Sequence, residues 1–235
     1  HYVENIVSRL AIHYGNNPTV IGWQIDNEPG HYGVVDYSEN AQAKFRIWLQ
    51  KKYGTIDKLN DTWGASFWSE TYQNFEQVRL PNQQEVPDKA NPHAMLDLNR
   101  FMADELAGFV NMQADILRRH IHKDQWITTN LIPIFNPVDP VRIDHPDFLT
   151  YTRYLVTGHN QGIGSQGFRM GIPEDLGFSN DQFRNRVGKA FGVMELQPGQ
   201  VNWGVYNPQP LPGAIRMWVY HVFAGGGKFV CNYRF

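Results

Sequence analysis

The spacing of apolar and polar residues along the chain predicts helices that alternate with short strands. Apolar residues recur at helical spacing in six segments, 1–14, 39–53, 56–63, 93–121, 181–189 and 213–224. Short apolar, β-branched runs bounded by turn residues predict five strands, 19–25, 126–131, 148–151, 191–196 and 228–233. The stretches 64–91 and 198–212 carry no such period and are predicted to be irregular.

Strands that alternate with helices indicate an α/β fold whose strands run parallel. Both a doubly wound sheet and a (β/α)8 barrel have this order of elements. No G-x-G-x-x-G loop directly follows a predicted strand, which argues against dinucleotide binding. The polar residues cluster where strands end, as in barrel enzymes. A (β/α)8 TIM barrel is therefore expected, and the five strands here supply only part of its eight.

The amino-acid composition excludes several classes of function. With 21 Lys+Arg against 23 Asp+Glu, the net charge of -2 gives no broad attraction to nucleic acid or to an anionic membrane. No apolar run is long enough to span a bilayer. The one cysteine, Cys231, excludes an internal disulfide framework and a cysteine-rich metal cluster. The 7 Trp, 11 Tyr and 14 Phe suit a large core or a site that stacks on sugars.

Two glutamates stand at strand ends. Glu28 follows the first predicted strand, and Glu195 lies near the end of the fourth. In a barrel both would face the same mouth, and two carboxylates across a mouth are the basic equipment for glycoside hydrolysis. In the alternative interpretation each glutamate is a strand-end residue paired with a nearby Arg or Lys. The strand pattern by itself leaves both interpretations open.

Residues near the glutamates favour the first interpretation. Asn27 can donate an amide hydrogen to a sugar hydroxyl. Trp203 lies in a loop that would overhang the site, where an exposed aromatic needs a partner to pack or stack on. Gln197, Asn202 and Asn207 add polar groups without charge. Together these residues indicate a neutral substrate such as a sugar.

Several segments resemble known proteins. Residues 23–28 (WQIDNE) and 193–203 (VMELQPGQVNW) are similar to the two signature segments of the family 42 glycoside hydrolases. Further similar segments are 61–69 (DTWGASFWS), 96–101 (LDLNRF), 128–130 (TTN), 206–213 (YNPQPLPG) and 233–234 (YR). The resemblance spans nearly the whole chain and keeps the order of the motifs. It implies a retaining β-galactosidase on a (β/α)8 barrel, in which these strands are the fourth to the eighth.

The resemblance also implies roles for single residues. Glu28 matches the acid/base and Glu195 the nucleophile of a double-displacement mechanism. Asn27 matches the residue that holds the 2-hydroxyl of the sugar. Trp203 matches a tryptophan that lines the galactose subsite.

Two further residues carry implied roles in substrate binding. Residues 151–154 (YTRY) stand where the family commonly reads Trp-Asp-x-Tyr, so Tyr154 keeps the tyrosine while Thr152 replaces an acid. Residues 159–170 also differ from the usual loop. These departures leave galactose as the leading sugar, with another β-glycoside as the alternative. Trp68 resembles a tryptophan that, in family trimers, reaches into the neighbouring subunit's site, which implies a homo-oligomer.

No metal or other cofactor is expected. Many family members carry a zinc-binding cysteine cluster after the acid/base, but residues 31–43 contain no cysteine. His31 alone falls short of the three or four ligands that a stable zinc site needs.

The resemblance makes residues 1–235 a single catalytic barrel domain that is incomplete at both ends. The first three strands would precede His1, and further galactose contacts would follow Phe235. The chain would then be a piece of a longer protein, and its localisation cannot be read from it.

Three functions follow from these observations. The chain belongs to an active hydrolase of β-galactosides, to a catalytically silent protein that binds carbohydrate, or to a fragment that is inactive alone. The partner in the first two cases is a β-galactoside oligosaccharide or another β-glycoside. An active enzyme would hydrolyse an aryl β-galactoside, whereas a binding module would hold sugar without releasing product.

Overall fold

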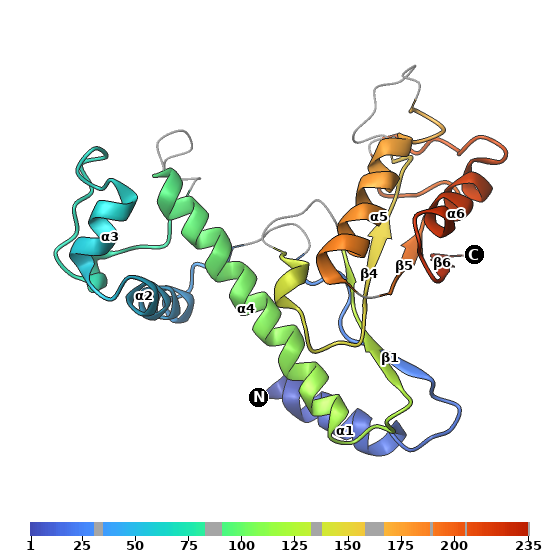
Figure 1. Cartoon of the computed structure of the whole chain (residues 1–235), viewed down its shortest axis with the longest axis horizontal. Helices are drawn as coiled ribbons and strands as arrows, with labels where there is room; N and C mark the ends of the chain where they lie inside the picture. Colours follow the sequence, from blue (N-terminus) through green and yellow to red (C-terminus); the bar gives the residue numbers. More distant parts are fainter. Residues whose placement is uncertain are drawn as a thin grey trace. The chain divides into compact units, whose positions relative to one another are not determined.

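The computed structural model describes residues 1–30, 35–82, 91–132, 138–157, 167–188, 190–204 and 206–234. The chain forms two compact units (Figure 1). The first, here called the sheet unit, contains residues 1–31 and 107–235, and the second, the helical unit, contains Tyr32–Leu106. Helix α4 (Pro92–Arg118) contributes its two halves to the two units.

The strands of the sheet unit are all parallel and follow one another in chain order. They are β1 (Gly22–Gln24), β2 (Trp126–Thr128), β3 (Asn130–Leu131), β4 (Leu149–Arg153), β5 (Phe191–Leu196) and β6 (Val230–Asn232). Strand β1 pairs with β2, and the second ladder runs β3-β4-β5-β6. The predicted α/β class with parallel strands is confirmed. A doubly wound sheet would reverse its strand order, and no reversal occurs among the described strands.

The single strand predicted at 126–131 is divided at Thr129. Residues before Thr129 pair with β1, and residues after it pair with β4. The Ile25 N–H still donates to the carbonyl of Thr128, and the Thr150 N–H donates to the carbonyl of Thr129. The Asp147 N–H, just before β4, also donates to the carbonyl of Ile127, so the extended segment lies between β1 on one side and the β4 segment on the other and joins the two ladders.

The helices of the sheet unit follow the predicted order. They are α1 (Tyr2–Tyr14), the second half of α4, α5 (Pro173–Val187) and α6 (Ala214–Ala224). The predicted start of α5 at residue 181 is wrong. The helix begins at Pro173 with Glu174 and Asp175 in its first turn, because proline suits the first helical position and acidic groups stabilise the amino end.

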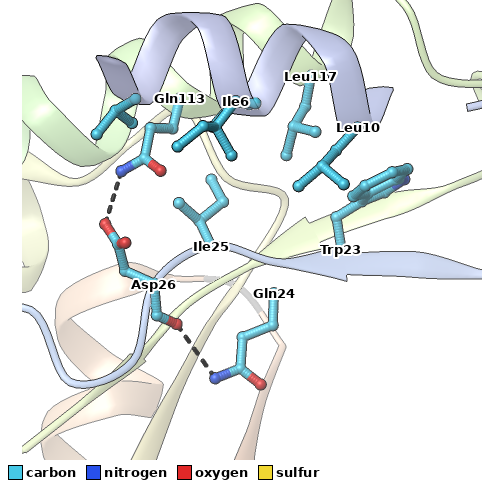
Figure 2. Close-up of a pocket in the computed structure, with 10 residues that line it drawn as sticks. Ile6, Leu10, Trp23, Gln24, Ile25, Asp26, Gln113 and Leu117 are labelled. Carbon is cyan, nitrogen blue, oxygen red and sulfur yellow. Dashed lines mark hydrogen bonds between the residues drawn. The ribbon is translucent and has the colours of Figure 1, made fainter. Parts of the chain in front are cut away.

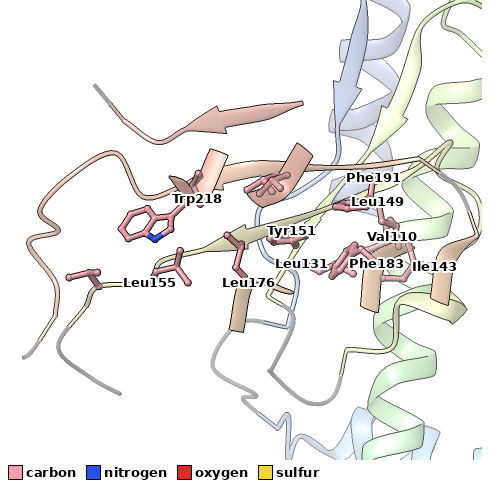
Figure 3. Packing of buried hydrophobic residues seen from close by; sticks show 14 of the residues in the cluster. Val110, Leu131, Ile143, Leu149, Tyr151, Leu155, Leu176, Phe183, Phe191 and Trp218 are labelled. Carbon is pink, nitrogen blue, oxygen red and sulfur yellow. The ribbon is translucent and has the colours of Figure 1, made fainter. Parts of the chain in front are cut away.

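The core of the sheet unit lies between the strands and helices α5 and α6 (Figure 3). The ring of Tyr151 lies 5.1 Å from that of Phe183 and 6.2 Å from that of Phe191. The hydroxyl of Tyr151 donates to Asn180 Oδ1 at 2.6 Å. This packing determines which face of β4 and β5 meets the helices, and so which face is left for polar side chains.

The helical unit contains α2 (Glu39–Tyr53), α3 (Ile56–Trp63), the short helix η2 (Phe75–Gln77) and the first half of α4. The predicted bounds of α2 and α3 are confirmed. Thr55 caps α3 as expected, because its side chain accepts a hydrogen bond from the Lys58 N–H. Across the described ranges, no helix combines the length and apolar character needed to cross a membrane.

A buried carboxylate joins the helices of the helical unit. Asp97, on α4, is 1% exposed. Its Oδ1 accepts from Lys52 and Arg100, and its Oδ2 accepts from the Tyr53 hydroxyl and, at 3.0 Å, from the Trp63 indole N–H. Burial alone would raise the pKa of Asp97, but the hydrogen bonds from Lys52, Tyr53 and Trp63 and the charge of Lys52 lower it on balance.

Asp97→Asn is expected to reduce the free energy of unfolding by about 3–5 kcal/mol, because it leaves buried donors without a charged acceptor. The pKa of folded Asp97 lies below its ordinary value of 3.8. The network therefore contributes its full stability above pH 3.8 and loses it as the pH falls through the lower folded pKa. Denaturant unfolding from neutral to acid pH measures both effects.

The matched control is Glu105→Gln. Glu105 pairs with Lys44 at the surface, and such exposed pairs contribute less than about 1 kcal/mol. Equal losses in Asp97→Asn and Glu105→Gln would contradict a central role for the Asp97 network.

Candidate active site

The strands of the sheet unit present mainly apolar side chains to the helices, and polar side chains lie on the opposite face. Leu131 and Tyr151 are register partners, and both belong to the core beneath α5 and α6. Successive side chains in a strand alternate between faces. Asn130 and Thr152 therefore lie on the face away from the helices.

A β-bulge in β5 brings Glu195 onto this polar face. Tyr151 pairs with Val193, but the next residue, Thr152, pairs with Glu195, so Met194 is the extra residue. Without the bulge Glu195 would point to the same side as Val193, which is fully buried among the helices. Bulges commonly re-aim a side chain beside an active site. Here the bulge turns the carboxylate of Glu195 away from the core.

The segment after β1 makes a sharp turn at the same end of the strands. Asp26 and Glu28 have φ values of 46° and 49°, in the left-handed region that non-glycine residues seldom adopt. The carboxylate of Asp26 accepts from Gln113 Nε2 of α4 at 2.6 Å (Figure 2). Strained backbone of this kind is frequent at functional sites, and here it positions Asp26 and Glu28.

Asn130 connects this turn to the neighbouring strands. Its side-chain oxygen accepts from Gln24 Nε2 at 2.8 Å and from the backbone N–H of Glu28 at 3.4 Å. Its amide nitrogen donates to Asn27 Oδ1 at 3.0 Å and to Thr152 Oγ1 at 2.9 Å. The sequence prediction missed this residue. An amide at the end of an apolar predicted strand, within the family-like segment 128–130, was the available signal.

Glu195 lies against Tyr154, which in turn packs against Trp203. The Tyr154 hydroxyl donates to Glu195 Oε2 at 2.9 Å. The ring of Trp203 meets the ring of Tyr154 edge-on, with 5.1 Å between their centroids, and 53% of Trp203 is exposed. The structure thus brings Glu195, Tyr154 and Trp203 together from three separate segments.

Glu195 and Glu28 are electrostatically coupled. Burial raises the pKa of Glu195, the hydrogen bond from Tyr154 opposes that rise, and the negative charge of Glu28 adds to it. Burial and the hydrogen bond to Glu195 raise the pKa of Tyr154, so its hydroxyl stays protonated as a donor. On balance the pKa of Glu195 lies above its ordinary value, and the hydrogen bond from Tyr154 limits that rise.

The interpretation of Gln197 as a polar group for substrate is wrong. Gln197 is fully buried, and its Oε1 accepts from the backbone N–H groups of Leu155 and Val156. Its Nε2 donates to the carbonyls of Val156 and Gly199. All four hydrogen-bonding positions of the amide are therefore used within the protein. Its contribution is to hold the segment after Tyr154 against the segment after Glu195.

The other side chains predicted to bind substrate differ in exposure and in the contacts they make within the protein. Asn27 and Asn202 are exposed. Asn207 accepts from the Gly204 N–H at 2.9 Å through its side-chain oxygen, which shapes the loop that carries Trp203. Trp68 belongs to the helical unit, where it is half-buried and packs edge-on against Phe67 with 5.1 Å between centroids. Its role remains a prediction.

A cavity of about 330 Å³ lies beside α1, β1 and α4 (Figure 2). Its lining is mainly apolar, and Glu28 and Glu195 do not belong to it. The cavity offers few partners for sugar hydroxyls.

Metal binding finds no support in the described part of the chain. No group of three or more His, Cys, Asp or Glu side chains there could hold a metal ion. His31 and residues 158–166 lie outside the described residues.

Comparisons with known proteins agree on one family. The sequence model of glycoside hydrolase family 42, described as beta-galactosidase, matches residues 1–235. The chain is 37% identical to a beta-galactosidase of a Thermus species, over 97% of this chain and 36% of that protein.

Solved structures give the same result. A beta-galactosidase from the psychrophilic Marinomonas ef1 matches with a TM-score of 0.89 and 33% identity, over 98% of this chain and 36% of that one. One from the Antarctic haloarchaeon Halorubrum lacusprofundi matches with a TM-score of 0.90 and 33% identity, over 98% and 35%. The chain therefore spans about a third of the length of these proteins.

Tyr154→Phe is expected to raise the pKa of Glu195 further, because it removes the hydrogen bond that lowers it. Carbon NMR titration of labelled glutamates measures this change, with Glu195→Gln to assign the signal. Tyr220→Phe is the control, since Tyr220 is an exposed tyrosine on α6. An unchanged or lower pKa of Glu195 in Tyr154→Phe would show that the hydroxyl does not stabilise the carboxylate.

Proposed function

Because the chain belongs to the β-galactosidase family, glycoside hydrolase family 42, we propose that its parent protein is a retaining hydrolase that removes terminal β-D-galactosyl residues from β-galactosides. The observation that carries the proposal is geometric: Asn130 ties the turn that carries Glu28 to β4, whose residue Thr152 pairs with Glu195, and the Tyr154 hydroxyl donates to Glu195. Residues 1–235 are the central part of its catalytic (β/α)8 barrel. In that barrel β1 is the fourth strand, β2 with β3 the fifth, and β4, β5 and β6 the sixth to the eighth.

Glu195 is the nucleophile in this proposal, and Glu28 is the acid/base. In the first step a carboxylate oxygen of Glu195 forms a bond to the anomeric carbon as the bond to the leaving oxygen breaks. Glu28 gives its proton to that oxygen. The Tyr154 hydroxyl holds one oxygen of Glu195 and stabilises its ionised form, which leaves the other oxygen for attack.

The second step reverses the roles of proton donor and acceptor. The ester removes the negative charge of Glu195, so an ionised Glu28 is no longer repelled. Glu28 takes a proton from water, the water oxygen bonds to the anomeric carbon, and Glu195 leaves as a carboxylate. Two inversions give net retention of the β configuration.

The neighbouring side chains bind the sugar. Asn27, which is exposed and held by Asn130, is proposed to bind the 2-hydroxyl. Trp203 offers an exposed ring beside Tyr154 for the apolar face of galactose. Trp68 is proposed to complete a neighbouring subunit's site in a homotrimer. No metal or cofactor takes part in either step.

Thr152 supports an alternative substrate. The residue stands where the family commonly has an acid, and its hydroxyl accepts from Asn130 while only 3% of the residue is exposed. The contact that an acid would make with the sugar is therefore not available from Thr152. The alternative is a barrel hydrolase of the same mechanism that acts on another β-glycoside.

Glu195→Ala in the full-length protein is expected to abolish hydrolysis of an aryl β-D-galactoside, because no glycosyl-enzyme can form. Glu28→Ala is expected to slow cleavage of a poor leaving group by about 10²–10⁴-fold, since general acid catalysis contributes that factor. Added azide should restore turnover of a dinitrophenyl galactoside in Glu28→Ala and yield the β-azide. Steady-state rates and proton NMR of the product anomer make these measurements.

The matched control is Glu174→Ala, which removes an exposed carboxylate in the first turn of α5. Undiminished turnover in Glu195→Ala would overturn the assignment of the nucleophile. Tight galactose binding by the wild-type protein without hydrolysis would indicate a silent binding protein. Faster hydrolysis of an aryl glucoside or fucoside than of the galactoside would select the alternative substrate.

A further inference from the structure

We propose that Asn130 is a positioning residue that sets Glu28 and Asn27 against the strand pair carrying Glu195. The proposal rests on the proposed function and deepens it, because it names a residue that acts through the acid/base without touching the substrate.

Asn130 uses its whole hydrogen-bonding capacity inside the site. The residue is fully buried, its oxygen accepts two hydrogen bonds, and its nitrogen donates two. An amide has no further positions to offer. A flipped amide would set its NH2 group against the Gln24 amide and the Glu28 N–H, so these partners also fix its orientation.

Asn130 lies just beyond the point where the backbone hydrogen bonds between β1 and β2 end. The pairing of β1 with β2 ends at Gln24 and Thr128, followed by the bond from the Ile25 N–H to the carbonyl of Thr128. Beyond that point the Asn130 side chain bonds the backbone of Glu28 and the side chain of Asn27. Its bond to Thr152 reaches β4, at the residue that pairs with Glu195. One side chain thus connects the turn that carries Glu28 to β4, the strand that pairs with the Glu195 strand.

The backbone at Glu28 needs such support. Its φ of 49° is costly for a residue with a side chain, and such conformations persist only where the surroundings hold them. The hydrogen bond from the Glu28 N–H to Asn130 is one of those restraints. Without Asn130 the turn can relax, and the Glu28 carboxyl moves away from the leaving oxygen while Glu195 keeps its bulge and its bond to Tyr154.

The loss of Asn130 therefore has a specific kinetic signature. Departure of a dinitrophenolate needs no proton, whereas departure of an alkoxide does. In full-length Asn130→Ala, we expect kcat/KM for methyl β-D-galactoside to fall about 100-fold, the effect of a displaced catalytic group. We expect kcat/KM for dinitrophenyl β-D-galactoside to fall much less, because its first step needs no proton from Glu28 and loses only what a displaced Asn27 contributes.

Two further variants separate positioning from stability. Asn180→Ala removes an equally buried amide that bonds Tyr151 and the carbonyl of His221 on the helix side. It should lower the melting temperature and leave the ratio of the two kcat/KM values unchanged. Thr152→Val keeps the shape of the side chain, removes one Asn130 partner, and tests the proposal if Asn130→Ala does not fold. It should lower the methyl galactoside value about tenfold more than the dinitrophenyl value.

Equal losses on both galactosides in Asn130→Ala, or the same change of ratio in Asn180→Ala, would show that Asn130 only stabilises the fold. If Asn130→Ala does not fold, equal losses in Thr152→Val overturn the proposal. Failure of the wild-type protein to hydrolyse either galactoside would instead overturn the proposed function, and this proposal with it.

Discussion

The site depends on the alternation of side chains in parallel strands that are covered by helices on one face. The core formed with α5 and α6 contains the side chains of Tyr151, Val193 and Leu196. Asn130 and Thr152 thereby lie on the opposite face, whereas Arg153 reaches the helix side and pairs with Asp175 of α5. Burial of large apolar side chains drives this choice, because their removal from water dominates the energetics of the unit.

The bulge at Met194 breaks the regular alternation of side chains and supplies the site with a carboxylate. It brings a carboxylate onto the polar face and keeps the next residue, Leu196, in the core. The left-handed turn at Asp26 and Glu28 is a second exception at the neighbouring strand. A buried amide, Asn130 of β3, holds the left-handed turn, and a second, Gln197 just after β5, ties the segment beyond Glu195 to the segment beyond Tyr154. Saturated amides suit this task, since they add no charge to a site that already contains two carboxylates.

The two units use buried polar groups for different purposes. In the helical unit Asp97 gathers donors from α2, α3 and α4, and the contacts stabilise a charge that would otherwise be costly to bury. In the sheet unit the amides carry no charge and organise backbone near Glu28 and Glu195. One arrangement joins helices, and the other sets the geometry of a reactive pair.

Sequence by itself determined the order of elements, the parallel α/β class, the family, and the two glutamates with Asn27, Tyr154 and Trp203 as candidates. These follow from local periodicity and from contiguous motifs, which short-range physics shapes. Tertiary structure alone decided the division of the strand at Thr129, the start of α5, the bulge at Met194 and the roles of Asn130 and Gln197. Strict alternation would have set Glu195 in the row of Phe191 and Val193. Register and hydrogen bonds between segments more than 40 residues apart overrule that local pattern, because a buried polar group must find its partners wherever the fold supplies them.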